Sequence, residues 1–251
     1  MSKIAFITGA TSGIGLATAK AFAKNGINLI LCGRNKIQLE NLEKELYSVV
    51  KVISLNFDVR NKSEVEESIN SLDLNWKQID ILVNCAGNAH GLSSIENGDL
   101  EDWDMMIDAN VKGLLYVSRF VMPLMVERKQ GHIINISSVA GKYTYQNGAV
   151  YCASKKAVEA ISEGMRLDLT QHGIKVTNIA PGAVETNFSV VRFKGDEERA
   201  KKVYEGFDPI KPEDVADTIF YAVNSPKNVT IADIVLYAGV QSAPTTIYRK
   251  N

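Results

Sequence analysis

Short apolar runs of strand length alternate with longer amphipathic stretches along most of this chain. The apolar runs span residues 3–8, 27–32, 52–57, 79–84, 132–137 and 175–180, with a last strand candidate at 231–237. Helical patterns fill intervals between them, notably residues 15–25, 35–47, 101–128 and 149–172. Strands that alternate with helices build a parallel sheet, and nearly continuous apolar strands need cover on both faces. The pattern predicts an α/β fold with a doubly wound, mainly parallel, seven-stranded sheet and helices on both faces.

Three local signals refine this expectation. Ser63 and Glu66 have the spacing of a capping box, which predicts a helix that begins there. Pro123 should kink or break the long helical stretch that contains it. Residues 184–209 mix polar, charged and aromatic side chains, and so long a connection is usually functional. No linker-like or repetitive stretch divides the chain, so residues 1–251 are expected to form one domain.

Composition narrows the class of partner. The chain has 28 Lys and Arg against 29 Asp and Glu, and this balance argues against a nucleic-acid or membrane-surface partner. No apolar run approaches the roughly 20 residues of a membrane helix, and the first run ends too early for a signal peptide. The three cysteines and three histidines are scattered, which predicts neither disulfides nor a metal site. We therefore expect a cytoplasmic protein with a small-molecule substrate.

A glycine-rich turn follows the first predicted strand. Gly9, Gly13 and Gly15 let the backbone turn tightly and approach a pyrophosphate, and the next helix would offer its N-terminal amides to phosphate. A ligand-free strand-to-helix turn is the alternative. The position of the turn after the first strand of an alternating chain favours nucleotide binding.

Arg34 follows the second predicted strand, where dinucleotide folds place the adenosine ribose. An acidic residue there would hold the ribose 2′-hydroxyl, but this chain has Gly33 and Arg34 instead. A guanidinium pairs well with a phosphate, so NADP is favoured over NAD. The alternative is that Arg34 is an ordinary solvated side chain.

Tyr151 and Lys155 are four residues apart within a predicted helix, and so share one face of it. A free tyrosine has a pKa of about 10, and a nearby ammonium would favour the phenolate. Tyr151 is therefore a candidate acid or base for carbonyl chemistry. Without its context, such a pair is usually a surface feature of a helix.

The context is a set of ordered motifs through which the chain resembles the classical short-chain dehydrogenases/reductases. The motif residues are Gly9, Gly13 and Gly15; Asn84, Ala86 and Gly87; Asn110; Ser138; Tyr151 and Lys155; and Pro181 and Gly182. Cys85 stands where the family usually has a second asparagine, and we expect little effect of this on adenosine binding. The resemblance implies a Rossmann-type fold and a nicotinamide cofactor.

The resemblance also implies a role for each motif residue. Tyr151 would exchange a proton with the substrate oxygen, Lys155 would bind the nicotinamide ribose and lower the pKa of Tyr151, and Ser138 would hydrogen-bond the substrate oxygen. Asn110 would hold a water on the proton path. Asp58 is similar to the family residue that meets the adenine amino group, and Val184 and Thr186 to those that hold the nicotinamide carboxamide. The implied cofactor-binding positions are Gly9, Thr11, Ser12, Gly13, Ile14, Gly15, Arg34, Asp58, Val59, Asn84, Ala86, Gly87, Tyr151, Lys155, Pro181, Gly182, Val184 and Thr186.

Three further stretches resemble one branch of this family, the NADP-dependent 3-hydroxy acid dehydrogenases. They are residues 101–107, 190–196 and 231–233. The branch includes serine and allo-threonine dehydrogenases and malonic semialdehyde reductases. It implies a homotetramer, in which two long helices at about 101–128 and 150–172 are buried between subunits, and a substrate lid at residues 184–209. Within that lid Arg192 is the candidate to bind the substrate carboxylate, alongside Ser138 and Tyr151 at the reacting carbon; Lys194 and Lys142 are the alternatives.

Two other functions remain open at this point. A 3-oxoacyl carrier-protein reductase, or a general carbonyl reductase, would share the motifs, and the carrier protein would need a basic docking patch. The candidates for that patch are Lys142, Arg192, Lys194, Arg199, Lys201 and Lys202. A non-catalytic NADP-binding regulator could dispense with Ser138, Tyr151 or Lys155, and all three are present.

Overall fold

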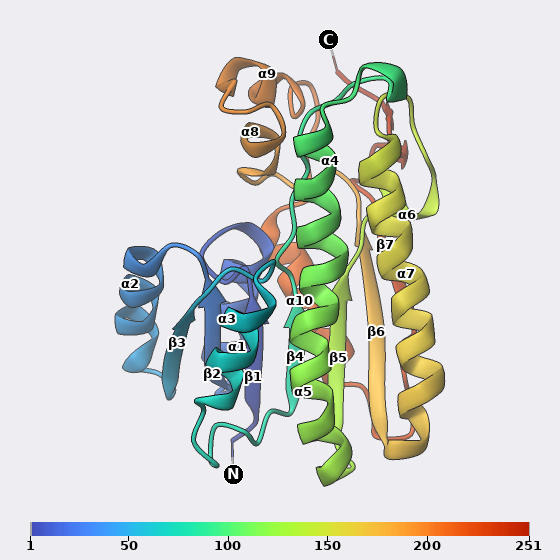
Figure 1. Ribbon diagram of the computed structural model, residues 1–251. Coiled ribbons are helices and arrows are strands. Elements are labelled where there is room, and N and C mark those ends of the chain that lie inside the picture. Colours follow the sequence, from blue (N-terminus) through green and yellow to red (C-terminus); the bar gives the residue numbers. More distant parts are fainter. Residues whose placement is uncertain (1, 251) are drawn as a thin grey trace.

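The computed structural model describes residues 2–250 and has a seven-stranded, wholly parallel sheet in the order β3-β2-β1-β4-β5-β6-β7 (Figure 1). The strands are β1 (Ile4–Thr8), β2 (Asn28–Gly33), β3 (Val52–Asn56), β4 (Ile81–Asn84), β5 (Gly131–Ile136), β6 (Ile174–Pro181) and β7 (Asp233–Leu236). This confirms the fold class that the alternating pattern predicts.

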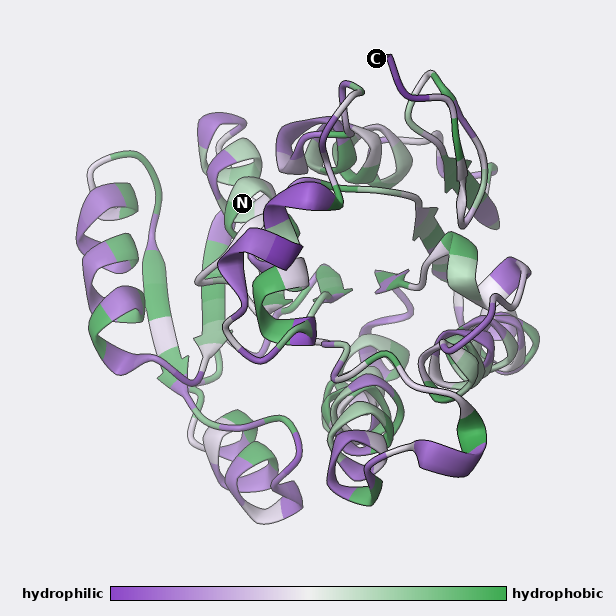
Figure 2. Ribbon diagram, turned by 90° about the horizontal axis from the view of Figure 1, so that it is seen from above, coloured by the Kyte–Doolittle hydropathy of each residue, from purple (hydrophilic) through white to green (hydrophobic). Residues whose placement is uncertain are grey.

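Helices cover both faces of the sheet. Helices α1 (Gly13–Lys24), α2 (Lys36–Tyr47) and α10 (Pro212–Val223) pack on one face, and α3 (Lys62–Asn70), α5 (Leu114–Arg128) and α7 (Ala149–Leu169) on the other. Successive strand residues point to opposite faces, so Ala5 and Ile7 join the first core and Phe6 the second. Seen from above, the strands are mostly hydrophobic, whereas the helices alternate hydrophobic with hydrophilic residues (Figure 2). Burial on both faces explains why the strands read as continuous apolar runs.

The carboxyl ends of all seven strands lie at one end of the sheet, opposite the N-terminus (Figure 1). From β1 the chain first proceeds outward to β2 and β3, and then returns to β4 on the other side of β1. Parallel sheets bind ligands in the crevice outside such a reversal. The short helices α4 (Leu100–Ile107), α6 (Val139–Lys142), α8 (Phe188–Arg192) and α9 (Glu197–Lys202) lie at this end of the molecule, as do the 3₁₀ turn η1 (Ile95–Asn97) and the hairpin strands described below; the 3₁₀ turn η3 (Thr170–His172) follows α7.

The long helical stretch expected at residues 101–128 is interrupted, but not at Pro123. A π-helical turn, η2 (Asp108–Gly113), separates α4 from α5. The expectation of a break at Pro123 was wrong, because α5 continues through it to Arg128. Pro123 removes one backbone hydrogen bond, and the buried Val121 and Met125 on either side of it anchor the helix in the core.

The start of α3 also differs from the expectation. Asn61 rather than Ser63 is the N-cap, and its side-chain oxygen accepts hydrogen bonds from the backbone amides of Ser63 and Glu64. Asn61 also donates from its amide group to the Glu64 carboxylate. The N-cap of α3 therefore lies two residues before the predicted one.

Residues 184–209, expected to be irregular, contain α8 and α9, and both ends of the segment are tied to each other. Val184 and Ile210 form a parallel bridge, in which Ile210 donates to the Ala183 carbonyl and Glu185 donates to the Ile210 carbonyl. A short hairpin, β8 (Gln241–Ala243) and β9 (Thr246–Ile247), follows the sheet and was not predicted. None of the helices within residues 2–250 combines the length and apolar character that a membrane span requires.

Candidate active site

A cleft of about 540 Å³ opens at the carboxyl ends of the strands. It extends from the glycine turn and the ends of β2 and β3, past β5 and α7, to the segment 184–209. Most of the predicted site residues line it, including Ser138, Tyr151, Lys155 and Arg192. Gly15, Asn84 and Asn110 do not line it.

The glycine turn forms one end of the cleft. Gly9 and Gly13 adopt positive φ angles of 67° and 51°, which favour glycine. A Cβ on Gly15 would lie 2.2 Å from the carbonyl oxygen of Gly9, so the turn can close on the start of α1 only without one. The side chain of Ser12, the N-cap of α1, makes no capping bond. Helix amides and an unengaged hydroxyl therefore border the cleft.

The ends of β2 and β3 place two arginines around one carboxylate. Arg34 is largely exposed and lies 4.0 Å from Asp58, whereas Arg60 is less exposed and pairs with Asp58 at 2.6 Å. All three residues line the cleft together with Val59. Burial alone would raise the pKa of Asp58, but the hydrogen bonds from Arg60 outweigh it and hold that pKa below its usual value. Asp58 therefore carries a full negative charge beside Arg34.

Tyr151 and Lys155 lie on the buried side of α7, facing the end of β5. Lys155 Nζ donates to the Ile136 carbonyl at 2.9 Å, and burial lowers the pKa of this ammonium to about 8. Burial raises the pKa of Tyr151, while the charge of Arg192 and a hydrogen bond with Ser138 oppose the rise. The largest charge that favours the phenolate comes from Arg192. A bound cofactor would change these balances by adding its own charges.

Ser138 caps α6 at the end of β5. Its hydroxyl accepts from the Ala140 amide at 3.1 Å and donates to the Pro181 carbonyl at 3.3 Å. These contacts fix the hydroxyl at the end of the cleft, near the Tyr151 ring. The sequence distinguished this residue from Ser137, whose hydroxyl instead donates to the Lys155 carbonyl and the Glu159 carboxylate, away from the reacting groups.

Asn110 lies in the π-helical turn with every polar atom of its side chain engaged. Its amide group donates to the Asn88 carbonyl and to Ser154 Oγ, and its oxygen accepts from the Asn88 amide at 2.8 Å. Asn110 therefore fixes the chain after β4 against α7. Its side chain has no free donor, so a water on the proton path would have to donate to the second lone pair of its oxygen or bind to other atoms.

Asn84 points into the core instead of the cleft. Its amide group donates to Ser118 Oγ and Asn135 Oδ1 at 3.0 and 2.9 Å, while its own oxygen has no partner among the described residues. The backbone beyond it approaches the glycine turn, because Thr8 Oγ1 accepts from the amides of Cys85 and Ala86. Asn84 thus sets the end of β4, and the cleft wall itself begins at Cys85.

Arg192 occupies the substrate end of the cleft. Its guanidinium carbon lies 4.7 Å from the centre of the Tyr151 ring and 5.0 Å from that of Phe188, and Nη2 donates to the Tyr145 hydroxyl. Its Nε is buried without a hydrogen-bond partner among residues 2–250, and no carboxylate there pairs with it. Arg192 therefore presents an unpaired positive charge beside the tyrosine.

The two alternative cations are already paired. Lys194 bridges Asp99 and Asp102 at 3.2 and 2.9 Å, and Lys142 bridges Glu159 and Asp233. Neither lysine lines the cleft. Of the three predicted cations, only Arg192 has the position and the vacant donors to bind a substrate carboxylate.

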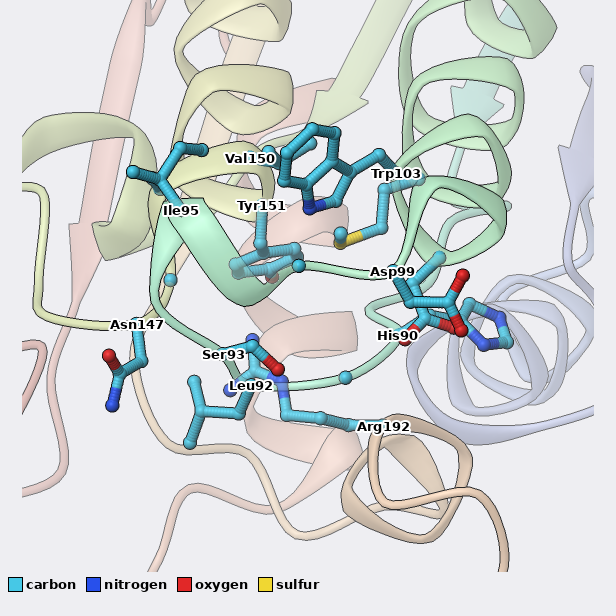
Figure 3. A pocket seen from close by; sticks show the side chains of 16 residues that line it. His90, Leu92, Ser93, Ile95, Asp99, Trp103, Asn147, Val150, Tyr151 and Arg192 are labelled. Atoms are coloured by element: carbon cyan, nitrogen blue, oxygen red, sulfur yellow. The ribbon is translucent and has the colours of Figure 1, made fainter.

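A small pocket of about 20 Å³ adjoins the substrate end (Figure 3). Tyr151, Trp103 and Arg192 border it, and Gly91 donates its amide to the Arg192 carbonyl at 2.9 Å. At this volume the pocket itself can hold only a few atoms.

Sequence analysis missed several residues that shape the site, notably Arg60, Tyr145, Phe188 and Gln241. Gln241 accepts from the Ala183 amide with its side-chain oxygen and lies against Gly182, where a Cβ would meet it. Tyr145 reaches Arg192 from a loop of no recognisable pattern. Only Arg60 gave a signal, as a second arginine close to the end of an expected strand.

Comparisons with known proteins agree with this geometry. The model of the short chain dehydrogenase family matches residues 3–197. The chain is 43% identical over 240 residues to an NADP-dependent 3-hydroxy acid dehydrogenase of Salmonella typhi, which covers 95% of this chain and 96% of the relative. It is 38% identical over 251 residues to a protein of the same name from Schizosaccharomyces pombe, covering 99% of this chain and 97% of that one. The solved closed form of a serine dehydrogenase complexed with NADP+ superposes with a TM-score of 0.90 at 40% identity, covering 99% of this chain and all of that one.

Proposed function

The chain belongs to the short-chain dehydrogenase family, and we propose that it is an NADP-dependent oxidoreductase of short 3-hydroxy acids. Substrates of the serine, allo-threonine and 3-hydroxypropionate type combine a secondary or primary hydroxyl with a carboxylate two carbons away. The names of the relatives support this class, and so does the site.

The observation that carries the proposal is the position of Arg192. An unpaired guanidinium lies against the ring of Tyr151 in a partly buried site. A neutral substrate would leave this charge without compensation, whereas a carboxylate could accept two hydrogen bonds from it. The adjoining pocket of about 20 Å³ is in keeping with a short substrate.

The residues of the cleft fit NADP. The glycine turn leaves a cradle that a Cβ on Gly15 would close, and the start of α1 offers amides to the pyrophosphate. Arg34 would bind the 2′-phosphate, Asp58 and Val59 the adenine, and Val184 and Thr186 the carboxamide. Lys155, with one donor used and two vacant, would bind the nicotinamide ribose.

The bound nicotinamide would accept or supply the hydride. Tyr151 would take the hydroxyl proton of the substrate in oxidation and return it to the carbonyl oxygen in reduction. Ser138, fixed by Ala140 and Pro181, would hydrogen-bond the same oxygen and orient it. Arg192 would hold the carboxylate and, by its charge, favour the phenolate form of Tyr151.

The segment 184–209 would act as the substrate lid. The bridge between Val184 and Ile210 holds the two ends of the segment together. Within the segment, Lys194 pairs with Asp102 of α4, and the Arg192 carbonyl accepts from Gly91 in the loop before α4. Closure at these contacts would exclude water from the reacting groups.

We also propose a homotetramer in the cytoplasm. Leu115 of α5 and Leu167 of α7 are 40% and 76% exposed on the two helices that the family resemblance places between subunits. Light scattering should give four times the chain mass of 27.5 kDa, and a monomer would refute this assembly. The three cysteines are unpaired, as a reducing compartment would keep them.

A carrier-protein reductase is the weaker alternative. The basic patch it needs would include Lys142 and Lys194, and both are neutralised by carboxylates.

The test is a substrate panel with the purified enzyme. We expect kcat/KM to be highest for L-serine, L-allo-threonine or 3-hydroxypropionate with NADP+, and much lower for their methyl esters or with NAD+. Equal turnover of acids and esters would refute the hydroxy acid assignment. A preference for NAD+ would refute the cofactor assignment.

A further inference from the structure

The Asp58 carboxylate lies between two guanidinium groups, one of which contacts it much more closely than the other. Arg60 donates to it from Nε at 3.0 and 3.1 Å and from Nη2 at 2.6 Å, in a fork that uses both oxygens. Arg34 only approaches it, with Nη1 at 4.0 Å. The fork of Arg60 therefore compensates the carboxylate and leaves the charge of Arg34 available.

This compensation matters because of what each group would bind. In the proposed function Asp58 meets the adenine and Arg34 meets the ribose 2′-phosphate of one cofactor molecule. An uncompensated carboxylate 4.0 Å from Arg34 would attract that guanidinium and repel a doubly charged phosphate. The same carboxylate would leave the uncharged 2′-hydroxyl of NAD almost unaffected.

We propose that Arg60 is a specificity-determining residue, which favours NADP over NAD by neutralising Asp58 instead of by touching the 2′-phosphate. The inference rests on the proposed function, since it concerns the same cofactor. Arg60 suits this role because it is only 30% exposed and its Nη1 contacts Met105 Sδ of α4, so that its fork is held in place. Arg34, at 63% exposed, keeps the mobility to follow the phosphate.

Direct binding of the two oxidised cofactors tests the proposal without any turnover. Dissociation constants for NADP+ and NAD+ would be measured by calorimetry for the wild type, Arg60→Gln, Asp58→Asn and the double variant. We expect Arg60→Gln to weaken NADP+ about tenfold more than NAD+, the change expected from one unpaired carboxylate near a dianion in a water-like medium. Because NAD+ reports adenine binding and folding, the ratio isolates the 2′-phosphate.

The double variant decides the mechanism. If Arg60 acts through Asp58, removing both charges should restore the wild-type ratio within about twofold. Arg60→Lys should retain most of the preference, because it keeps the charge. Lys62→Gln is the matched control: it removes an exposed positive charge nearby, and the ratio should not change.

Three outcomes would overturn the proposal. Equal losses for both cofactors in Arg60→Gln would make Arg60 a structural residue. A double variant that stays deficient for NADP+ would mean that Arg60 contacts the phosphate directly. If Lys62→Gln changed the ratio as much as Arg60→Gln does, the cofactor preference would depend only on the net positive charge of this surface. The wild type is measured before any variant. If it prefers NAD+, the proposed cofactor itself is refuted.

Discussion

Replacing Arg192 by methionine should remove the substrate carboxylate contact while preserving the packing of the lid. Methionine is long enough to cover the Tyr151 and Phe188 rings, on which the guanidinium now stacks at 4.7 and 5.0 Å. The change therefore deletes a charge and its donors more than it deletes apolar contact. This distinguishes it from truncation to alanine, which would also open a cavity.

The magnitude follows from the environment of the guanidinium. Removing one partner of a buried, hydrogen-bonded charge pair costs about 2–5 kcal/mol. Arg192 is half-buried, so solvent screens part of the interaction and the lower half of that range applies. A loss of about 2–3 kcal/mol corresponds to a fall of roughly 30- to 150-fold in kcat/KM for a 3-hydroxy acid.

The assay compares each acid with its methyl ester in the wild type and the variant. The ester lacks the carboxylate charge, so its kcat/KM should fall by less than about threefold. Arg199→Met is the matched control, because this arginine stacks on Phe193 in the same segment but does not line the cleft. Parallel losses for acid and ester would indicate a general lid defect, and no loss for either would refute the anchor.

The same variant should shift the pH dependence of oxidation. The positive charge of Arg192 lowers the pKa of Tyr151, and its removal must therefore raise that pKa. Since oxidation needs the phenolate, the rise of kcat/KM with pH should move to higher pH in the variant. A profile that stays in place would show that Arg192 has no electrostatic influence on the tyrosine.

Three further predictions concern the acid–base group, the glycine turn and the core. Tyr151→Phe should lower kcat at least about 100-fold, because the lost phenol would exchange the proton, while calorimetry should show that NADP+ binding survives, since the phenol is not the main cofactor anchor. Normal turnover would exclude Tyr151 from the mechanism. Gly15→Ala would place a Cβ 2.2 Å from the Gly9 carbonyl oxygen, so it should abolish cofactor binding and lower the free energy of unfolding by about 1–3 kcal/mol. Gly164→Ala is the control, because a Cβ there meets nothing within 4 Å, and it should change neither quantity. Burial lowers the pKa of His132 to about 4, so the unfolded chain binds the proton first and the free energy of unfolding decreases as pH falls from about 6.5 towards 4. In urea unfolding, this decrease should be about 3 kcal/mol smaller for His132→Gln than for the wild type. The same pH dependence in both proteins would refute the role of His132.

The sheet was predictable because burial on both faces leaves a clear pattern in each strand. The interior of the long helical stretch was not, because no side chain marks the π-helical turn at Asp108–Gly113. The helix does not break at Pro123, because tertiary packing outweighs one lost hydrogen bond. The predicted start of α3 was wrong for a different reason. Asn61 and Ser63 are both residues that cap helices well, and the sequence alone does not decide between them.

The site was predictable where chemistry restricts the residue type. The glycines, Tyr151 and Lys155 have few substitutes in their proposed roles, so their spacing is informative, and Gly9, Gly13, Tyr151 and Lys155 do line the cleft. The charge state of the site was less accessible, since it depends on side-chain contacts that no motif marks. Arg60 pairs with Asp58 two residues before it, and Arg192 contacts Tyr145 from a distant segment. The pairing of Lys194 with Asp102 of α4 joins distant segments in the same way, and together with its position outside the cleft it separates that lysine from Arg192 as a carboxylate anchor.

The π-helical turn between α4 and α5 sets the rotation of α4 relative to α5 about their shared helix axis. A π turn accommodates one more residue than an α turn, and each residue of a helix advances about 100° around its axis. Deleting a single residue between Asp108 and Gly113 would therefore rotate α4 by that angle relative to α5 and turn Asn110 away from Asn88, while the core contacts of α5 remained in register. A change of chain length at this point should therefore disturb the site even where every residue type is kept. When distant relatives are aligned, a one-residue gap here would indicate that the contact between Asn110 and Asn88 is lost.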